Sequence, residues 1–310
     1  MSEIDELAAA ALRRYPLSAD ATATLCNVSE NHTYRVDDGA RAYALRVHRP
    51  GYRTAHQIAC ELQWSDALRD DRAVDTPVTV DSLDGERVVD VNGRNVVLFE
   101  WLPGVIPDPD GADVIAGFRT LGALSARMHG HSREWRAPDG FDRPDWDYDH
   151  TIGARGHWGR WQDGLGMGPE ERALLERLDA YGRDEMRYGL VHADIRLANL
   201  LVDDGDVRVI DFDDCGFAWF MYDFATTVSF MEDHPRVPEL RDAWVEGYRA
   251  VAPLDPGDEA ELETFVMLRR LLLVAWIGSH HEFATEAAEL GAGFTAGTCA
   301  LAERYLSTHS

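Results

Sequence analysis

The chain has 310 residues and is strongly acidic, with 55 aspartate and glutamate residues against 30 arginines, no lysine and a formal net charge of -25. Proteins that bind nucleic acids or anionic membranes concentrate lysine and arginine, so this charge argues against both kinds of partner. The length exceeds that of an average single domain and predicts either two lobes or one large domain.

The N-terminal segment "MSEIDELAAAALRRY" predicts an amphipathic helix rather than a signal peptide, because no basic stretch precedes an apolar core. The longest strongly apolar run, residues 271–278, is far shorter than the roughly 20 residues that cross a bilayer. The four cysteines are widely separated and form no Cys-x-x-Cys pair, so neither a zinc site nor a disulfide framework is indicated. We therefore expect a soluble, cytoplasmic protein.

Residues 22–100 show strand-like alternation that is interrupted by one helical segment, which predicts a small sheet with a helix. Beyond the segment "FEWLPG" (99–104) the pattern becomes helical. We expect helices at 113–130, 169–187, 221–232, 238–250 and 258–281. This change of character predicts an N-terminal lobe over residues 1–100 and a C-terminal lobe over residues 101–310, and it places the fold in the α+β class.

The expected strand "YALRVHRP" (43–50) carries Ala44 and Arg46 on one face and its large apolar side chains on the other. Glu61 lies on the inward stripe of the helix that follows. A buried carboxylate requires a partner, and Arg46 is the natural candidate. The alternative is a surface arginine with a glutamate that bends out to solvent.

Residues 199–211 predict a hairpin, in which two short strands flank an Asp-Gly turn. The open end of such a hairpin would bring Asn199 and Asp211 together, where an amide carbonyl and a carboxylate could share one hard cation. Asp194 lies on the loop that enters the same end. The aspartates within 203–206 are typical turn residues.

The pattern of His192, Asp194 and Asn199, followed by a strand, a turn and Asp211, resembles the catalytic layout of protein-kinase-like phosphotransferases. On this spacing the chain is similar to the aminoglycoside phosphotransferase and choline kinase-like family, and within it to stress-response kinase A and the type II homoserine kinases. The resemblance extends from Tyr34 to the helices that end near residue 281. It implies a bilobal protein-kinase-like fold, with a small antiparallel-sheet N-lobe containing one helix and a larger, mainly helical C-lobe.

The resemblance also implies roles for the acidic residues. Asp194 would be the catalytic base for the substrate hydroxyl, and Asn199 and Asp211 would hold Mg²⁺ against the phosphates of ATP. Asp213 would contact a second metal ion or the acceptor. His192 would buttress the loop, and Asp223, a carboxylate among apolar residues, would support it from a neighbouring helix.

In the N-lobe, Arg46 stands where the family places the lysine that grips the ATP phosphates, and Glu61 would orient it. Arginine is a planar fork and lysine a point charge, so the exchange is chemically significant. Small Ala44 would leave space for the adenine ring. The three residues would form the phosphate end of the nucleotide site.

Two further segments would complete that nucleotide site. Residues 27–36 replace a glycine-rich loop without containing glycine, and the backbone N–H groups from Ser29 to Asn31 could approach phosphate. Backbone groups from Glu100 to Leu102 would form a hinge that reads adenine. The alternative for the second segment is a plain linker between lobes.

The phosphate acceptor would be reached through the large lobe. The irregular segment 135–161 could attract a cationic or amino-bearing hydroxyl compound through carboxylates and aromatic faces, or it could consist of packed tryptophans and a solvated loop. Its candidate residues are Trp146, Asp147, Asp149 and Trp158, and "HHEF" (280–283) could line the same region.

We therefore expect an ATP-dependent kinase that phosphorylates an amino alcohol, a hydroxyamino acid, a sugar or an aminoglycoside. Two alternatives stay open: a protein Ser/Thr kinase of the stress-response type, and a nucleotide-binding pseudokinase that acts as a regulatory module. The presence of Asp194, Asn199 and Asp211 favours an enzyme. The sequence does not specify the acceptor, the preference for ATP over GTP, or the oligomeric state.

Overall fold

The computed structural model describes residues 2–28, 31–159, 168–280 and 285–309, with residues 285–289, 291, 292 and 309 described by their backbone alone. The chain divides into two compact units. Unit 1 comprises Met1–Val105, Ala137–Arg143 and Leu201–Asp213, and unit 2 comprises Ile106–Arg136, Pro144–Leu200 and Asp214–Ser310. The first unit thus extends to Val105 and takes in two later segments, whereas the sequence suggested one boundary after residue 100.

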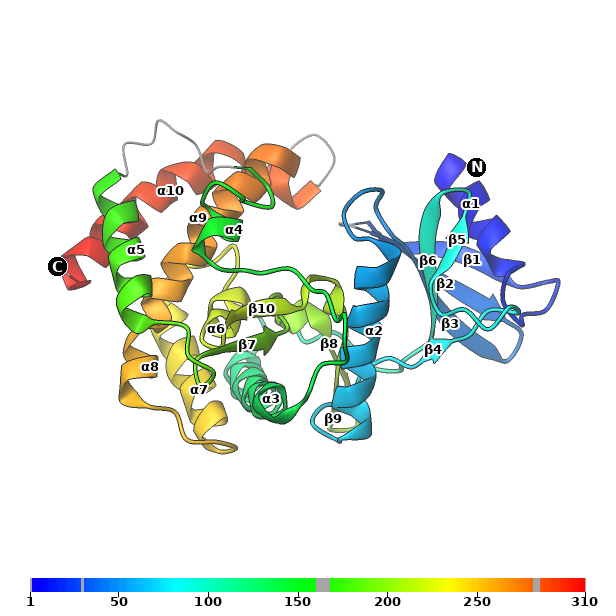
Figure 1. Cartoon of the computed structure of the whole chain (residues 1–310), viewed down its shortest axis with the longest axis horizontal. Coiled ribbons are helices and arrows are strands. Elements are labelled where there is room, and N and C mark those ends of the chain that lie inside the picture. Colours follow the sequence, from blue (N-terminus) through cyan, green and yellow to red (C-terminus); the bar gives the residue numbers. More distant parts are fainter. Residues whose placement is uncertain (1, 29–30, 160–167, 281–284, 310) are drawn as a thin grey trace. The chain divides into compact units, whose positions relative to one another are not determined.

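An antiparallel sheet forms the centre of unit 1, and its described strands follow the order β1-β2-β3-β6-β4, with β5 paired to β6 (Figure 1). The strands are β1 (Thr22–Val28), β2 (His32–Asp38), β3 (Arg41–Val47), β4 (Thr79–Val80), β5 (Val89–Val91) and β6 (Arg94–Glu100). Asn92 and Gly93 join β5 to β6 with φ angles of 54° and 80°. Positive φ at both central residues is typical of the type I′ turn, which matches the twist of a hairpin.

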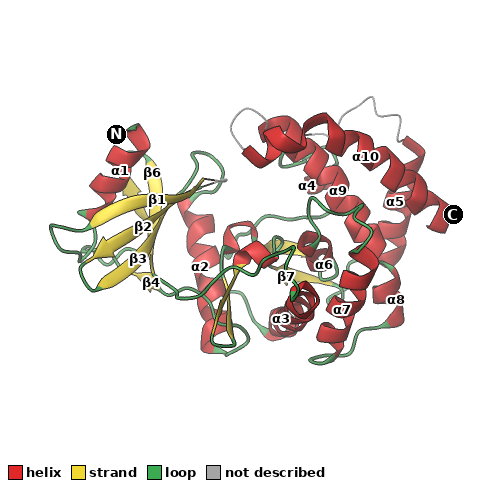
Figure 2. Ribbon diagram, turned by 180° about the vertical axis from the view of Figure 1, so that it is seen from behind, coloured by secondary structure: helices red, strands yellow, loops and turns green. Residues whose placement is uncertain are grey.

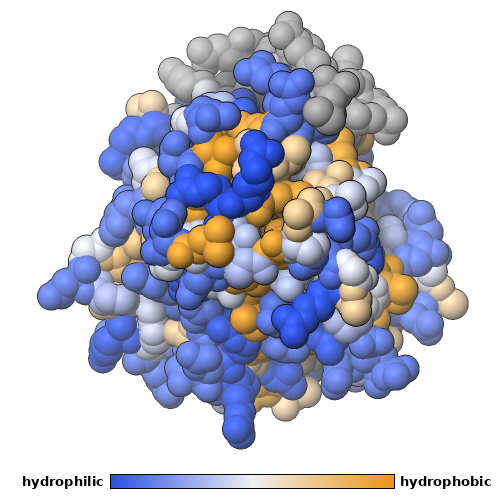
Figure 3. Space-filling view, turned by 90° about the vertical axis from the view of Figure 1, so that its right-hand side faces the viewer, coloured by the Kyte–Doolittle hydropathy of each residue, from blue (hydrophilic) through white to orange (hydrophobic). Residues whose placement is uncertain are grey.

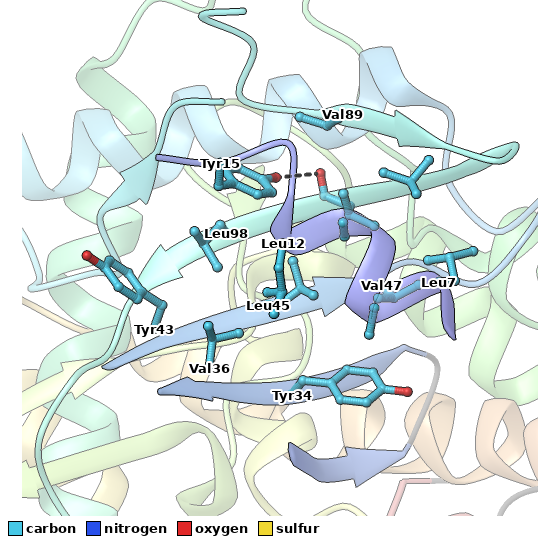
Figure 4. Packing of buried hydrophobic residues seen from close by; sticks show 14 residues of the cluster. Leu7, Leu12, Tyr15, Tyr34, Val36, Tyr43, Leu45, Val47, Val89 and Leu98 are labelled. Atoms are coloured by element: carbon cyan, nitrogen blue, oxygen red, sulfur yellow. Dashed lines mark hydrogen bonds between the residues drawn. The ribbon is translucent and has the colours of Figure 1, made fainter. Parts of the chain in front are cut away.

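Helix α1 (Glu3–Leu12) covers one face of this sheet. Ser2 and Asp5 form a capping box at its start, which satisfies two of the exposed N–H groups of the first turn. Figure 4 shows Leu7 and Leu12 facing apolar side chains of the strands. The strand residues in this cluster include Tyr34, Val36, Tyr43, Leu45, Val47, Val89 and Leu98. The alternation predicted for residues 43–47 is confirmed, because every second side chain of β3 enters this core.

Helix α2 (Ala55–Asp70) packs on the sheet through Ile58 and Leu62, which contact Val97 of β6. Thr54 caps its start by accepting a hydrogen bond from the Gln57 N–H at 3.1 Å. The ring of Phe212 meets Trp64 of this helix edge-on, with 5.8 Å between ring centroids. This contact attaches the later segment Leu201–Asp213 to unit 1.

Unit 2 is mainly helical (Figure 2). Its helices are α3 (Val114–Glu134), α4 (Tyr148–Thr151), α5 (Gly168–Tyr181), α6 (Tyr222–Thr227), α7 (Val237–Arg249), α8 (Pro256–Ala260), α9 (Leu262–His280) and α10 (Thr285–His309). Strands β7 (Tyr188–Val191) and β10 (Gly216–Trp219) pair antiparallel. Every predicted helix has a counterpart, although those predicted at 169–187 and 221–232 end early and 258–281 is split in two. Helices α4 and α10 were not predicted.

The predicted acidic hairpin is present as β8 (Leu200–Asp203) and β9 (Asp206–Val209). Asp204 and Gly205 form its turn with φ angles of 48° and 91°. Asn199 does not lie on the first strand, as expected, but ends a short 3₁₀ turn, Leu197–Asn199, just before it. The predicted hairpin therefore has its turn at the expected place, but its first strand starts one residue later and its second strand ends two residues earlier than expected.

The face of the molecule seen in Figure 3 is covered mainly by hydrophilic residues, with hydrophobic residues gathered in small areas between them. This surface agrees with the acidic composition. Among the described residues, no helix has both the length and the apolar character that crossing a bilayer demands.

Together, the antiparallel sheet of unit 1 and the helices of unit 2 match the expected α+β class, with a smaller sheet-containing part and a larger, mainly helical part.

Candidate active site

The loop that follows β7 is held by a buried carboxylate. The Asp223 side chain on α6 is fully buried and accepts hydrogen bonds from the Ala193 N–H at 2.9 Å and the His192 N–H at 3.4 Å. Ala193 has a φ of 65°, a conformation that costs a residue other than glycine about 1–3 kcal/mol and persists only where the surroundings enforce it. Asp223 supplies that enforcement, as the sequence predicted.

His129 of α3 supports Asp223 from behind. Its Nε2 lies 3.0 Å from Asp223 Oδ2, and its Nδ1 lies 3.2 Å from the Tyr248 hydroxyl. Burial lowers the pKa of His129 despite the neighbouring carboxylate, so the ring is neutral. The network then assigns the proton to Nε2, which donates to Asp223, while Nδ1 accepts from Tyr248.

Asp194 follows this loop and is held from several directions. Its Oδ1 accepts a hydrogen bond from Arg269 Nη2 at 2.8 Å, and its Oδ2 lies 3.1 Å from Asn199 Nδ2 and 3.5 Å from Arg196 Nε. Its own N–H donates to His192 Nδ1 at 3.3 Å, which gives His192 the buttressing role expected of it. The Asp194 side chain keeps a 19% exposed fraction and thus remains accessible to a reactant.

The buried Asn199 side chain donates from Nδ2 to the Asp194 backbone carbonyl at 2.8 Å and to the Asp194 carboxylate at 3.1 Å. These two acceptors fix the orientation of the amide, since a flipped amide would set oxygen against oxygen. Its Oδ1 is consequently turned away from Asp194. A carbonyl oxygen in that orientation suits a hard cation such as Mg²⁺.

Arg269 was not identified from the sequence as a site residue. Only 3% of it is exposed, yet its side chain reaches Asp194 from α9. The available signal was the pair Arg269 and Arg270 inside the otherwise apolar run 265–277, since a buried arginine requires an anionic partner. The sequence does not reveal which carboxylate that partner is.

In unit 1, Asp211 lies two residues beyond the end of β9 with a φ of 63°. Its side chain is 42% exposed, and its Oδ1 lies 3.5 Å from Arg46 Nη1. A left-handed conformation at a residue other than glycine is uncommon and marks a strained position. The strain turns Asp211 out of the strand direction that the sequence predicted for it.

Arg46 and Glu61 form the predicted ion pair, in which Arg46 Nη2 donates to Glu61 Oε1. Both side chains are buried, so the alternative of a solvent-exposed pair is wrong. Burial opposes the charge of Arg46, but the carboxylates of Glu61, Asp213 and Asp211 outweigh it and raise the pKa of Arg46 above its usual value. Arg46 of β3 thus stays fully charged beside Glu61 of α2.

Asp213 is enclosed within unit 1. Its Oδ2 accepts from Asn31 Nδ2 at 2.9 Å, its Oδ1 lies 3.7 Å from His48 Nδ1, and its backbone carbonyl accepts from Arg143. Burial alone would raise the pKa of Asp213, but the surrounding cations, Arg46 foremost, lower it. These contacts hold the buried Asp213 in place, and its predicted contact with a second metal ion or the acceptor stays a prediction.

The remaining nucleotide-site predictions have mixed support. Ser29 lies outside the described residues. The side chain of Asn31 is occupied at both ends, by Asp213 and by the N–H of Arg49 at 3.0 Å. Ala44 is half-buried and lies opposite Phe99 in the sheet.

The predicted hinge begins at the end of β6, where its backbone is still bonded to the neighbouring chain segments. The N–H of Glu100 donates to Val78 at 2.8 Å, and that of Trp101 donates to Ala42 at 3.2 Å. Glu100 is exposed and Leu102 half-buried. The first two N–H groups of the segment are therefore committed to the sheet.

The segment proposed to attract a cationic acceptor has its carboxylates neutralised. Asp147 pairs with Arg183 and His150, each at 2.7 Å, and Asp149 pairs with Arg155 at 2.6 Å. The predicted attraction through these two carboxylates is therefore not supported.

The tryptophans of this segment favour packing. Trp146 is fully buried and donates from its indole N–H to the Asp214 carbonyl at 2.8 Å, and the half-buried Trp158 packs 5.6 Å from it. The ring of His280 meets Trp158 edge-on. Residues 160, 161 and 281–283 of the predicted acceptor region lie outside the described residues.

Comparison with known proteins connects these features to one family. A family model described as "Phosphotransferase enzyme family" matches residues 25–262. A solved structure of a microcompartment-associated aminopropanol kinase is 46% identical, covers 98% of both chains and has a TM-score of 0.90. Homoserine kinase of Zymomonas mobilis is 27% identical over 80% of this chain and 78% of its own length.

Amicoumacin kinase of Bacillus subtilis is 26% identical over 94% of this chain and 90% of its own length. A solved amicoumacin kinase, in complex with AMP-PNP, Ca²⁺ and its substrate, is 22% identical with a TM-score of 0.78 over 97% of this chain and 92% of that chain, which shows a common fold. These matches span nearly the whole chain, and they confirm the resemblance inferred from residues 192–214.

Proposed function

Because the chain belongs to the phosphotransferase enzyme family, we propose that it transfers the γ-phosphate of ATP to the hydroxyl group of a small amino alcohol. The acceptor class is inferred from the aminopropanol kinase, which is 46% identical over 98% of the chain. Arg46, Glu61, Asp194, Asn199 and Asp211 are the residues to which we assign the reaction.

In this proposal the acceptor hydroxyl gives its proton to Asp194 as its oxygen bonds to the γ-phosphorus. The bond from that phosphorus to the oxygen bridging to the β-phosphate breaks, and ADP leaves with the electron pair. Asn199 Oδ1 and the Asp211 carboxylate would hold Mg²⁺, which neutralises charge on the transferring phosphate. Asp213 is left out of this assignment because its contacts hold it within unit 1.

On the nucleotide side, Arg46 would contact the phosphates while Glu61 holds its guanidinium. An arginine offers five N–H donors in a fixed fork, so it can serve Glu61 and a phosphate at the same time. The Glu100 carbonyl and the Leu102 N–H would form the hydrogen bonds to adenine. The N–H groups of Glu100 and Trp101 already donate to the Val78 and Ala42 carbonyls. Ala44 would leave room for the adenine ring.

The single observation that carries the proposal is the orientation of Asn199. Both of its N–H donors are directed to Asp194, and this orientation supports the proposed use of its carbonyl oxygen as a metal ligand beside a partly exposed carboxylate. A regulatory pseudokinase would have no use for this arrangement, and we therefore favour an enzyme. The likeness to small-molecule kinases over nearly the full length favours a small acceptor over a protein.

The experiment is an acceptor panel with purified protein and Mg-ATP. The panel comprises 1-amino-2-propanol, ethanolamine, choline, homoserine, an aminoglycoside and a generic protein substrate, and ADP release is measured. We expect acceptor-dependent release with the amino alcohols. Release with protein substrate alone would favour the protein-kinase alternative, and tight nucleotide binding without release for any acceptor would favour the pseudokinase.

A further inference from the structure

We propose that Arg269 is a positioning residue that fixes the catalytic carboxylate of Asp194 and determines which of its oxygens takes the proton. This inference rests on the function proposed above. It concerns a contact within unit 2, between α9 and the loop that follows β7. Arg269 acts through Asp194 and is not assigned any contact with substrate.

The guanidinium of Arg269 is itself held in a fixed plane. Its Nε donates to Ser229 Oγ at 3.0 Å, and its Nη1 lies 3.3 Å from the Tyr222 hydroxyl and 3.5 Å from the Ala193 carbonyl. Its Nη2 donates to Asp194 Oδ1 at 2.8 Å. A fork anchored at its other nitrogens cannot follow a rotating carboxylate, so it restricts the Asp194 side chain to one orientation.

The two oxygens of Asp194 are therefore unequal. Oδ1 receives a short, charge-assisted hydrogen bond from a buried cation, whereas Oδ2 has a neutral amide at 3.1 Å and Arg196 at 3.5 Å. Charge-assisted hydrogen bonds are roughly twice as strong as neutral ones. Protonation of Oδ1 would therefore cost more free energy than protonation of Oδ2. We assign Oδ2 as the oxygen that receives the hydroxyl proton.

The next residue in the chain provides a matched comparison. Arg270 is also buried on α9, but its Nη1 donates to Glu232 at 2.8 Å, its Nε to Thr298 at 2.8 Å and its Nη2 to the Phe294 carbonyl at 2.7 Å. Two adjacent arginines of equal burial thus serve different purposes. One reaches the catalytic loop, and the other joins α9 to α10.

The first test compares Arg269→Met with Arg270→Met, because methionine has a similar length and no charge. We expect both variants to lower the midpoint of thermal unfolding, since each leaves a carboxylate without its partner. Only Arg269→Met should lower kcat, by about 100-fold, because a misplaced catalytic group costs on that order.

The KM values for Mg-ATP and acceptor should stay within about threefold in Arg269→Met. Arg269→Lys should recover part of the lost kcat, since lysine restores the charge without the planar arrangement of donors.

A second test needs no turnover. In a double-mutant cycle of Arg269→Met and Asp194→Asn, the double variant should lose less thermal stability than the sum of the single variants, because the Asp194→Asn change removes the charge that Arg269→Met leaves unpaired. Additive losses, or a kcat for Arg269→Met no lower than that of Arg270→Met, would overturn the inference. If no acceptor supports turnover by the wild type, the proposed function fails, while the cycle still decides whether this ion pair holds Asp194.

Discussion

Arg46 stands where the resemblance to the family places a phosphate-binding lysine, and its surroundings suit the role proposed for it. One nitrogen of the fork pairs with Glu61, and another lies 3.5 Å from Asp211, one of the proposed metal ligands. A lysine could not approach two carboxylates with separate donors in a fixed geometry. In the proposed function, an arginine therefore keeps the positive charge at the phosphate end of the site and changes how its donors are arranged.

Replacing Arg46 with alanine should weaken ATP binding, lower turnover at least 10-fold and destabilise the fold by roughly 3–5 kcal/mol, because Glu61 would be left buried and unpaired. Isothermal titration with Mg-ATP, steady-state kinetics and urea unfolding measure the three effects. Arg41→Ala is the matched control, since Arg41 lies on the same strand but is exposed. Unchanged ATP affinity and turnover in Arg46→Ala would show that this residue does not contact the phosphates.

His129 predicts a pH dependence of stability. Burial lowers its pKa in the folded protein, whereas an unfolded histidine titrates near 6.5. Below that pH His129 binds a proton in the unfolded chain but stays neutral in the folded chain. The free energy of unfolding therefore falls as the pH decreases through about 6.5. Stability from this group is fully present above that pH.

His129→Gln should lose this pH dependence, because the glutamine amide donates to Asp223 and does not titrate. Urea unfolding at pH 7.5 and 5.5 should show the difference in unfolding free energy moving in favour of the variant by up to about 1.4 kcal/mol per pH unit below 6.5. If wild type and variant change in parallel between these pH values, folding does not lower the pKa of His129.

At the scale of elements, α3 and α7 approach each other through glycines. A Cβ added at Gly122 of α3 would overlap the Trp244 carbonyl of α7, and one added at Gly247 of α7 would overlap the Arg119 carbonyl of α3. Because the obstacle on each side is backbone, a side-chain rotation cannot relieve it. The close approach of α7 also brings Tyr248 to His129, which supports the catalytic loop through Asp223.

Gly122→Ala should therefore lower the free energy of unfolding by about 1–3 kcal/mol, the usual cost of overpacking. Gly130→Ala in the same helix is the control, since a Cβ there meets nothing within 4 Å and alanine favours helix by up to about 1 kcal/mol. Urea unfolding of both variants gives the comparison. Equal stability of the two would mean that α3 and α7 do not depend on these glycines.

Local patterns predicted much of this structure, and the reasons differ from one feature to the next. Alternation along β3 fixed the faces of Ala44 and Arg46, and helical spacing placed Glu61 inward, so their pairing could be predicted from local geometry. Arg269 could not be assigned a partner, because Asp194 is 75 positions away and only tertiary packing brings them together. The sequence left two alternatives open for Asp147 and Asp149 for the same reason, since local periodicity does not reveal their partners Arg183 and Arg155.

For the molecule as a whole, the absence of lysine means that every buried cationic side chain except histidine is an arginine. In the described residues three such arginines, Arg46, Arg269 and Arg270, are held by separate carboxylates. Guanidinium stays charged when buried, whereas a buried lysine shifts its pKa readily. In this acidic chain, buried arginines therefore neutralise particular buried or half-buried carboxylates by forming ion pairs with them.

The family was recognisable at this scale because its catalytic spacing lies within one continuous stretch, residues 192–214. The acceptor was not, because no comparable stretch specifies it and two carboxylates of the segment that looked suited to a cation, Asp147 and Asp149, already pair with arginines. The amino alcohol assignment thus comes from the likeness to the aminopropanol kinase over the full chain.

The most direct test of the central claim is phosphorus NMR of a reaction containing the protein, Mg-ATP and 1-amino-2-propanol. The account predicts that the γ-phosphate signal disappears while ADP and a phosphate monoester of the amino alcohol appear in equal amounts. Asp194→Asn, which keeps the side-chain volume but removes the proton acceptor, should bind Mg-ATP and form neither product. Monoester formation by Asp194→Asn at the wild-type rate would contradict the role of Asp194 on which the account depends.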